Sequence, residues 1–281
     1  MMNRRDRRRL FSRLMTTATL AAALLAVLPL FLIFAYLVFK GASSVNVDFF
    51  IQNPAPPGVS GGGVANAIVG TGIVVGVGSL IGLPLGVGAG IYLAEYGSGK
   101  LAYTVRFVAD VLNGTPSIIV GVFVFTWFVR PMGHFSALAG AVALAILMIP
   151  MVTRTTEEMI RLVPNSLREA ALALGYTRWR TSLAIVVRTA TPGIMTGALV
   201  AVARITGETA PLLFTALGNV NFRTDVMEPM QTLSLQVYAY AVGPFPEWHR
   251  LAWGAALVLV ALVLTFGIAA RYATRAKYEA N

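Results

Sequence analysis

Long runs of residues without Asp, Glu, Lys or Arg alternate along the chain with short polar segments. Once the Asn-, Pro- and Gly-rich segment 45–63 is taken as a loop, six runs approach the roughly 20 apolar residues of a membrane-spanning helix. We place the spans near 18–39, 65–94, 107–129, 135–152, 190–214 and 251–271. The pattern predicts an all-α polytopic membrane protein. Its transmembrane domain would cover 18–272, between a basic tail at 1–17 and a second tail at 273–281.

The composition excludes a soluble domain. Of the 281 residues, 57% are hydrophobic and 12% are charged, whereas soluble domains carry about 25% charged residues. Cysteine is absent, which excludes a disulfide-stapled fold. The first run is longer than the apolar part of a signal peptide, so we expect a retained helix.

The positive charges indicate how the chain crosses the bilayer. With the N-terminus in the cytoplasm, the outward segments contain only Lys40, Arg130, Arg223 and Arg250 of the 22 Lys and Arg residues. This bias follows the positive-inside rule and predicts that both termini are cytoplasmic. Topology also accounts for the net charge of +10, so we expect no nucleic-acid partner.

The second span is dense in glycine. Four pairs have the small-xxx-small spacing that lets helix backbones approach closely in lipid: Gly72/Gly76, Gly78/Gly82, Gly82/Gly86 and Gly86/Gly90. We interpret this spacing as internal packing. A face for a second copy or a related subunit is the alternative.

The third span opens with polar residues around a proline, in the stretch Asp110–Ser117. Pro116 interrupts the backbone hydrogen bonds, with Thr115 and Ser117 on either side of it. A broken helix at membrane depth must be satisfied by protein or by a water-filled cavity. The stretch therefore predicts either a hinge that lines a pathway or an ordinary helix start capped by Asn113 or Thr115.

The fifth span contains two ionisable residues, Arg204 and Glu208. Their spacing of four would place them on one face of a helix, where they could pair. An arginine at membrane depth is a candidate functional residue, and its fork of N–H donors matches an oxyanion. Glu208 would then hold Arg204 and compete with the anion for it. The alternative is an ion pair that only fixes helix packing.

The longest cytoplasmic loop, 154–188, is expected to contain two short helices. Ser166 and Glu169 have capping-box spacing, Gly175 would end the first helix, and Thr177 would cap the second. Docking of a cytosolic partner explains this loop better than DNA binding. In the external loop 216–250, the stretch 231–240 predicts a short amphipathic or re-entrant segment.

The chain lacks the motifs of an enzyme. It has no G-x-x-x-x-G-K-[ST] sequence, no H-E-x-x-H and no cysteine, and its two histidines are His134 and His249. We therefore expect no catalytic residues, no metal site and no nucleotide site in this chain.

Four stretches resemble known transporters. The stretch from Glu169 to Gly175 (EAALALG) is similar to the E-A-A-x-x-x-G loop of ABC-importer membrane subunits. The stretches 91–96, 110–119 and 204–214 resemble the PstA-type phosphate permeases, and the resemblance extends from about residue 65 to the C-terminus. One departure is Arg188, where such permeases usually have proline.

The resemblance implies a type I ABC importer permease in the cytoplasmic (inner) membrane of a prokaryote. Its coupling loop would dock on a PstB-like cytosolic ATPase dimer, which would bind the ATP and Mg, so that this chain holds no cofactor. A PstC-like second permease would complete the pore, and a PstS-like periplasmic or extracellular binding protein would deliver phosphate.

The resemblance also implies site residues. It associates Arg204 and Glu208 with phosphate translocation, and we add Thr209, Ser117 and Thr115 as further candidates on the pathway. The docking candidates all lie in the coupling loop: Glu169, Ala170, Ala171, Gly175 and Arg178.

Three other functions fit parts of the pattern. The first is a permease for another oxyanion, such as molybdate, sulfate or phosphonate. The second is an ion-coupled secondary anion transporter in which Arg204 and Glu208 form a proton-coupled pair. The third is a membrane scaffold or sensor subunit without transport.

Overall fold

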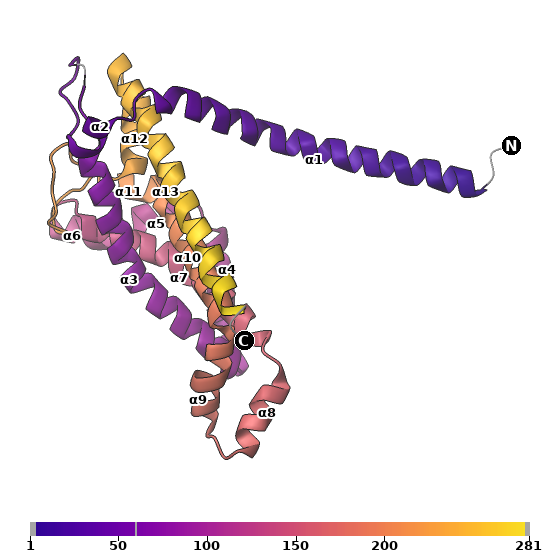
Figure 1. Ribbon diagram of the computed structural model, residues 1–281. Helices are drawn as coiled ribbons and strands as arrows, with labels where there is room; N and C mark the ends of the chain where they lie inside the picture. The colour runs from indigo at the N-terminus through magenta and orange to yellow at the C-terminus, as the bar shows by residue number, and fades with distance from the viewer. Residues whose placement is uncertain (1–3, 60, 279–281) are drawn as a thin grey trace.

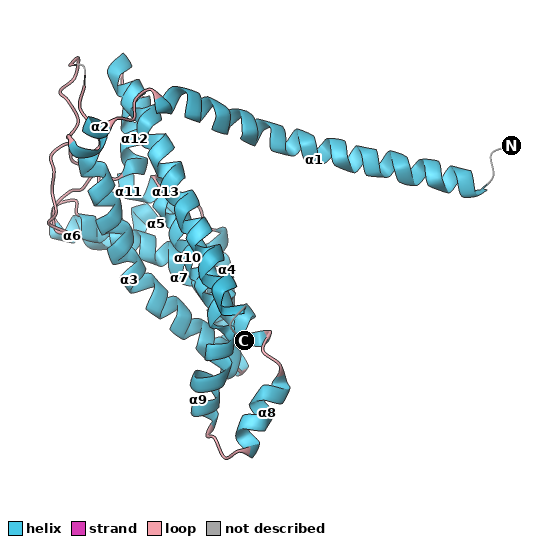
Figure 2. Cartoon of the chain, viewed as in Figure 1, coloured by secondary structure: helices cyan, strands magenta, loops and turns pink. Residues whose placement is uncertain are grey.

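The computed structural model describes residues 4–59 and 61–278, and within these residues the chain is helical with no strand (Figure 2). Five helices are long and apolar enough to span a membrane, or six if one strongly bent helix pair is counted as a span. The all-α polytopic fold predicted from the sequence is therefore confirmed.

The N-terminal helix α1 (Arg4–Ala42) projects away from the other helices (Figure 1). Only its C-terminal end contacts the bundle, where a Cβ on Gly41 would lie 2.8 Å from the carbonyl oxygen of Trp253. The span expected near 18–39 lies within this helix, and the basic tail expected at 1–17 is helical from Arg4. Residues 1–3 lie outside the described part.

The centre of the bundle is the contact between α3 (Ala65–Glu95) and α7 (Ala137–Arg161). Glycines at every fourth position of α3 lie directly against α7. Cβ atoms on Gly82, Gly86 and Gly90 would lie 3.0 Å or less from Met148, Val152 and Thr156. The glycine spacing therefore serves internal packing, as we expected. Gly72 and Gly76 instead face open space.

The segment expected as one span near 107–129 is a helix broken at Pro116, where the sequence indicated an interrupted backbone. Helix α4 (Gly99–Gly114) ends before Thr115, and α5 (Ser117–Val124) begins after Pro116. A π-helical turn (Phe125–Val129) and α6 (Arg130–Met132) follow. The axes bend by 105° at the break. Thr115, before the proline, is extended, since proline lacks an N–H and disfavours the helical conformation in the residue before it.

The segment expected near 190–214 is also interrupted. Helix α9 (Arg178–Thr181), a π-helical turn (Ser182–Val187) and α10 (Arg188–Thr206) form one continuous rod of 29 residues. The rod ends at Gly207, and α11 (Ala210–Leu213) follows it. The chain is helical through Arg188, and Pro192 lies within the same rod without ending it.

The remaining helices cover the two ends of the bundle (Figure 1). At one end lie α2 (Val47–Ile51) and α12 (Leu233–Ala241), and at the other lies α8 (Asn165–Ala173), next to α9. Helix α13 (Pro246–Tyr278) runs between the ends, so the expected tail at 273–281 is helical as far as it is described. Residues 279–281 lie outside the described part.

Candidate functional site

The two interrupted segments contact one another inside the bundle. Helix α5, after the break at Pro116, packs against α11, after the break at Gly207. The approach is close, because a Cβ on Gly121 would lie 2.6 Å from the Cα of Pro211. Discontinuous helices that meet in this way are typical of membrane transport sites, since they present backbone groups that a continuous helix would use internally.

The expected helical pairing of Arg204 with Glu208 is not formed. The helix ends at Thr206, so Glu208 is no longer on the same helical face as Arg204. The Glu208 N–H donates to the Ile205 carbonyl in the turn, and no ion pair of Arg204 occurs among residues 4–59 and 61–278. Arg204 is exposed on the surface of the single chain, whereas Glu208 and Thr209 are half-buried. The guanidinium is therefore available to an anion or to a neighbouring chain.

The hydroxyl groups at the first break have different surroundings. The Thr115 hydroxyl donates to the Val111 carbonyl at 2.8 Å, so its proton is used within α4. Thr115 and Ser117 are both half-buried. Helix α5 has Pro116 at its N-cap and no side-chain cap, so capping of this helix by Asn113 or Thr115 is wrong.

A polar contact that the sequence did not predict holds the second break. The Ser234 hydroxyl of α12 donates to the Glu208 carbonyl at 2.8 Å. Helix α12 is itself fixed to α3, because the Leu233 N–H donates to the Thr71 hydroxyl at 2.8 Å. The stretch 231–240 is therefore a short helix that supports the interruption, and its polar residues within an apolar run were the available signal.

The coupling-loop candidates lie on α8, on α9 and, for Gly175, in the turn between them, and the two helices lie together at one end of the bundle (Figure 1). Glu169, Ala170, Gly175 and Arg178 are exposed, whereas Ala171 is buried. The surface formed by the four exposed residues is free to receive a partner.

The ends of α8 agree only in part with the sequence prediction. Gly175 adopts a left-handed φ of 84°, and the next N–H bonds back to the Ala171 carbonyl, a helix stop that favours glycine. The predicted capping box of Ser166 and Glu169 is wrong, because α8 already begins at Asn165 behind Pro164. Thr177 occupies the N-cap of α9 but makes no side-chain capping bond.

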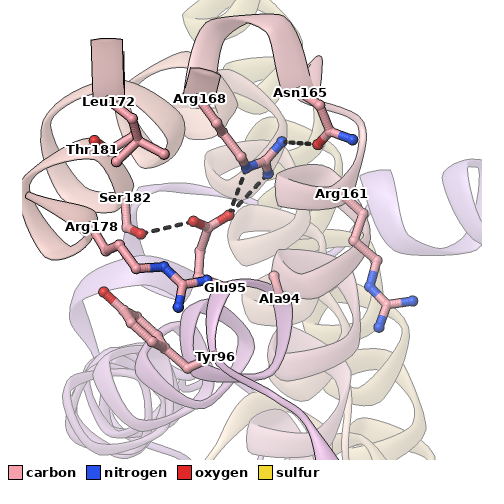
Figure 3. Close-up of a pocket in the computed structure, with 10 residues that line it drawn as sticks. All are labelled: Ala94, Glu95, Tyr96, Arg161, Asn165, Arg168, Leu172, Arg178, Thr181 and Ser182. Carbon is pink, nitrogen blue, oxygen red and sulfur yellow. Dashed lines mark hydrogen bonds and ion pairs between the residues drawn. The ribbon is translucent and has the colours of Figure 1, made fainter. Parts of the chain in front are cut away.

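Beside the coupling helices lies a pocket of about 320 Å³ that sequence reasoning did not find (Figure 3). Its lining includes Arg161, Arg168 and Arg178 together with Glu95, the last residue of α3. The Glu95 carboxylate accepts hydrogen bonds from Arg168 and from Ser182 (Figure 3). These residues are 73 and 87 positions away from Glu95 in the chain, so no local pattern indicated the contact.

A second ion cluster surrounds Glu157 on α7. Its side chain is 2% exposed and contacts Arg106 at 2.7 Å, Arg154 at 3.1 Å and Arg161 at 2.7 Å. Arg154 also pairs with Asp110 at 2.9 Å. The cluster ties α4 to α7 near the coupling end, and the sequence prediction had included none of these pairs.

The helical bundle, its interrupted segments and its exposed coupling helices define an integral-membrane transport component. Residues 86–277 match the family described as binding-protein-dependent transport system inner membrane component. The chain is 46% identical over 265 residues to the phosphate transport system permease protein PstA of Yersinia pestis, covering 94% of this chain and 90% of the relative. A probable PstA of Methanocaldococcus jannaschii is 39% identical over 91% of this chain and 90% of its own. The chain therefore belongs to the binding-protein-dependent transport family, and these curated relatives within it are phosphate permeases.

Solved structures of lower identity show the same fold. A chain of a bacterial ABC transporter for import of the acidic polysaccharide alginate matches with a TM-score of 0.67 at 17% identity, covering 95% of this chain and 98% of that one. A chain of the inward-facing MetNI methionine ABC transporter matches with a TM-score of 0.60 at 23% identity, covering 76% and 93%. The type I ABC importer fold that the resemblance implied is confirmed.

Proposed function

We propose that this chain is a permease subunit of an ATP-driven importer that carries inorganic phosphate across the cytoplasmic membrane. The 46% identity to a phosphate permease over nearly the whole chain carries the proposal. The chain has no P-loop motif, so ATP and Mg would bind a separate PstB-like ATPase dimer. A PstC-like permease and a PstS-like binding protein would complete the assembly, and both termini of this chain would face the cytoplasm.

Arg204 would contact the anion during translocation. It is exposed at the end of α10, beside a helix interruption, and it is not neutralised by Glu208. A guanidinium offers several N–H donors in one plane and binds phosphate oxygens in charge-assisted hydrogen bonds. Glu208 and Thr209 lie in the turn that follows, and Ser117 and Thr115 flank the other break. We place all four on the wall of the pathway.

The rod formed by α9, the π-helical turn and α10 would couple the two ends. Arg178, a docking candidate, lies at its first residue, and Arg204 lies near its last turn. At 1.5 Å per residue the two are about 39 Å apart along the rod. A movement of the ATPase surface that displaces α8 and α9 would therefore move Arg204 as well. This chain would do no covalent chemistry itself.

Reconstitution tests this proposal. The chain is placed in liposomes alone, and then with its candidate permease, ATPase and binding-protein partners, and uptake of labelled orthophosphate is measured. We expect uptake only with the full set and only with ATP. Uptake by the chain alone would contradict the proposal and indicate an ion-coupled secondary transporter.

The substrate is tested by competition in the same liposomes. Unlabelled phosphate should displace the labelled anion, whereas molybdate, sulfate and phosphonate should compete weakly. An assembled complex that takes up one of these anions in place of phosphate would overturn the substrate assignment. An assembled complex that takes up none of the four anions would contradict transport and indicate a scaffold.

A further inference from the structure

Glu95 joins three parts of the chain through one carboxylate (Figure 3). It is the last residue of α3 and its side chain is 9% exposed. Oε1 accepts from Arg168 Nε at 3.1 Å and Nη2 at 2.9 Å, and Oε2 accepts from the Ser182 hydroxyl at 2.7 Å. Arg168 lies on α8 and Ser182 in the rod, so α3 is bonded to both sides of the coupling loop.

Arg168 makes a second set of contacts, with residues between the last turn of α7 and the start of α8. Nη1 donates to the Val163 carbonyl at 2.6 Å and to Asn165 Oδ1 at 3.1 Å, and Nη2 donates to the Ile160 carbonyl at 3.0 Å. The guanidinium of Arg168, which lies on α8, thus bonds to the C-terminal ends of both α3 and α7. Its planar fork fixes orientation as well as distance.

The position of Arg168 on α8 links these contacts to the docking surface. It directly precedes Glu169, whose side chain is exposed on the docking surface of α8. Exposed ion pairs contribute little because solvent screens them, but Glu95 is almost completely buried and its bonds are charge-assisted. A displacement of α8 by a docked partner is therefore passed to α3 and to the rod rather than absorbed in the loop.

We propose that Glu95 and Arg168 are positioning residues that transmit the movement of the coupling helix to the membrane helices. The proposal rests on the proposed function, because it concerns the coupling of ATP hydrolysis to transport. Loss of the pair leaves α8 able to bind the ATPase but no longer bonded to α3, so that α3 does not follow the movement of α8 and the rod.

The test uses the full transporter in liposomes, with phosphate uptake and ATP hydrolysis measured in the same sample. Glu95→Gln keeps the shape of the side chain and removes its charge. We expect phosphate imported per ATP hydrolysed to fall about tenfold, as loss of one charge-assisted bond implies. The amount of ATPase that co-purifies should stay unchanged. Glu158→Gln, on an exposed glutamate of α7, is the matched control.

Two results of this experiment would overturn the proposal. One is a ratio of phosphate to ATP equal to that of the wild type. The other is a fall in uptake that is matched by loss of co-purified ATPase, since the pair would then only shape the docking surface. Failure of the proposed function is separate, because the wild-type complex itself would then import no phosphate.

Replacing the Glu95–Arg168 ion pair by a covalent cross-link gives an independent test. The chain contains no cysteine, so Glu95→Cys with Arg168→Cys introduces a unique thiol pair for a short bis-maleimide. The double variant should be uncoupled before cross-linking and regain coupled uptake afterwards, while a mono-maleimide should restore nothing. Cross-linked protein that stays uncoupled, or thiols that do not cross-link, would contradict the proposed role of the Glu95–Arg168 pair.

Discussion

Two charged side chains in this bundle have opposite surroundings. Arg204 is exposed and forms no ion pair among the described residues, whereas Glu157 is buried and contacts three arginines. A charge without a partner is available to a ligand, and a charge surrounded by partners serves the structure. The two residues therefore predict different phenotypes.

Arg204→Gln should reduce phosphate uptake by about 10- to 100-fold, the effect expected for loss of one or two charge-assisted hydrogen bonds. Uptake into liposomes containing the full complex measures this, with subunit composition checked by gel filtration. Arg223→Gln is the control, because Arg223 lies on the surface in an exposed pair with Glu228. Equal uptake by the Arg204 variant and the wild type would remove Arg204 from the pathway.

Glu157→Gln should destabilise the chain, because it leaves three arginines without their shared carboxylate. Breaking a buried ion pair costs about 3–5 kcal/mol, and partial exposure of these arginines places the expected loss near the lower value. The Tm of the purified complex measures the change. Glu158→Gln, at the exposed neighbouring position, should leave the Tm unchanged. Equal Tm values for the two variants would refute a structural role of the cluster.

At the scale of elements, the four-residue spacing of glycines along α3 sets how closely it packs on α7. Thr156 Cβ would lie 2.5 Å from a Cβ on Gly90, while a Cβ on Gly88 would meet nothing within 4 Å. The two glycines are one helical half-turn apart in the same apolar run. Replacing each of them by alanine therefore separates the effect of helix packing on stability from the effect of helix propensity.

Gly90→Ala should lower the Tm of the complex, because overpacking a close helix contact costs about 1–3 kcal/mol. Gly88→Ala should leave the Tm unchanged or raise it slightly, since alanine favours the helix. Thermal unfolding of the purified complexes, followed by circular dichroism, compares the two. Similar shifts in both variants would show that the α3–α7 contact tolerates a methyl group.

The helices could be predicted from the sequence where a long apolar run coincides with one uninterrupted helix, as at 65–94. The interruptions could not be placed fully. Pro116 marked the first break, but apolar content alone does not report a bend of 105°. Gly207 ended α10 between two residues whose spacing had suggested one helical face. A spacing of four residues places two side chains on one face only while the backbone between them remains helical.

The candidate site was predictable to a similar degree. Arg204 was found because a charge in an apolar run is unusual, and Glu169 because its loop has a recognisable pattern. Glu95 and Arg168 were missed as a pair because they are 73 residues apart and meet only through folding. Contacts of this kind form only because folding brings the C-terminal ends of α3 and α7 next to α8.

At the scale of the whole molecule, α8, α9 and the described end of α13 share one end of the bundle (Figure 1). The segment 154–188, which includes α8 and α9, contains six arginines. We propose that this end faces the cytoplasm, as the positive-inside rule predicts. The opposite end has α2, α12 and the loop that contains Asn221. In the proposed topology, the two ends of the bundle face opposite sides of the membrane.

Single cysteines test this orientation. With no native cysteine to replace, Ser98→Cys should react with a membrane-impermeant maleimide only in inside-out vesicles. Asn221→Cys should react only in right-side-out cells or spheroplasts. Both positions are exposed, so access to the reagent differs only by the side of the membrane. Labelling of both from one side would contradict the proposed topology.

The exposed guanidinium of Arg204 also has a consequence for biosynthesis. An arginine at the centre of a membrane helix costs about 2.5–3.5 kcal/mol during insertion, and one nearer the helix end costs less; among the described residues, Arg204 has no ion-pair partner to offset that cost. If a second permease covers that surface, as we propose, α10 would carry this cost until the partner assembles, and the unassembled chain would be a substrate for membrane quality control. We expect its steady-state level, measured by immunoblot, to fall in cells that lack the partner permease, even when its messenger RNA is unchanged.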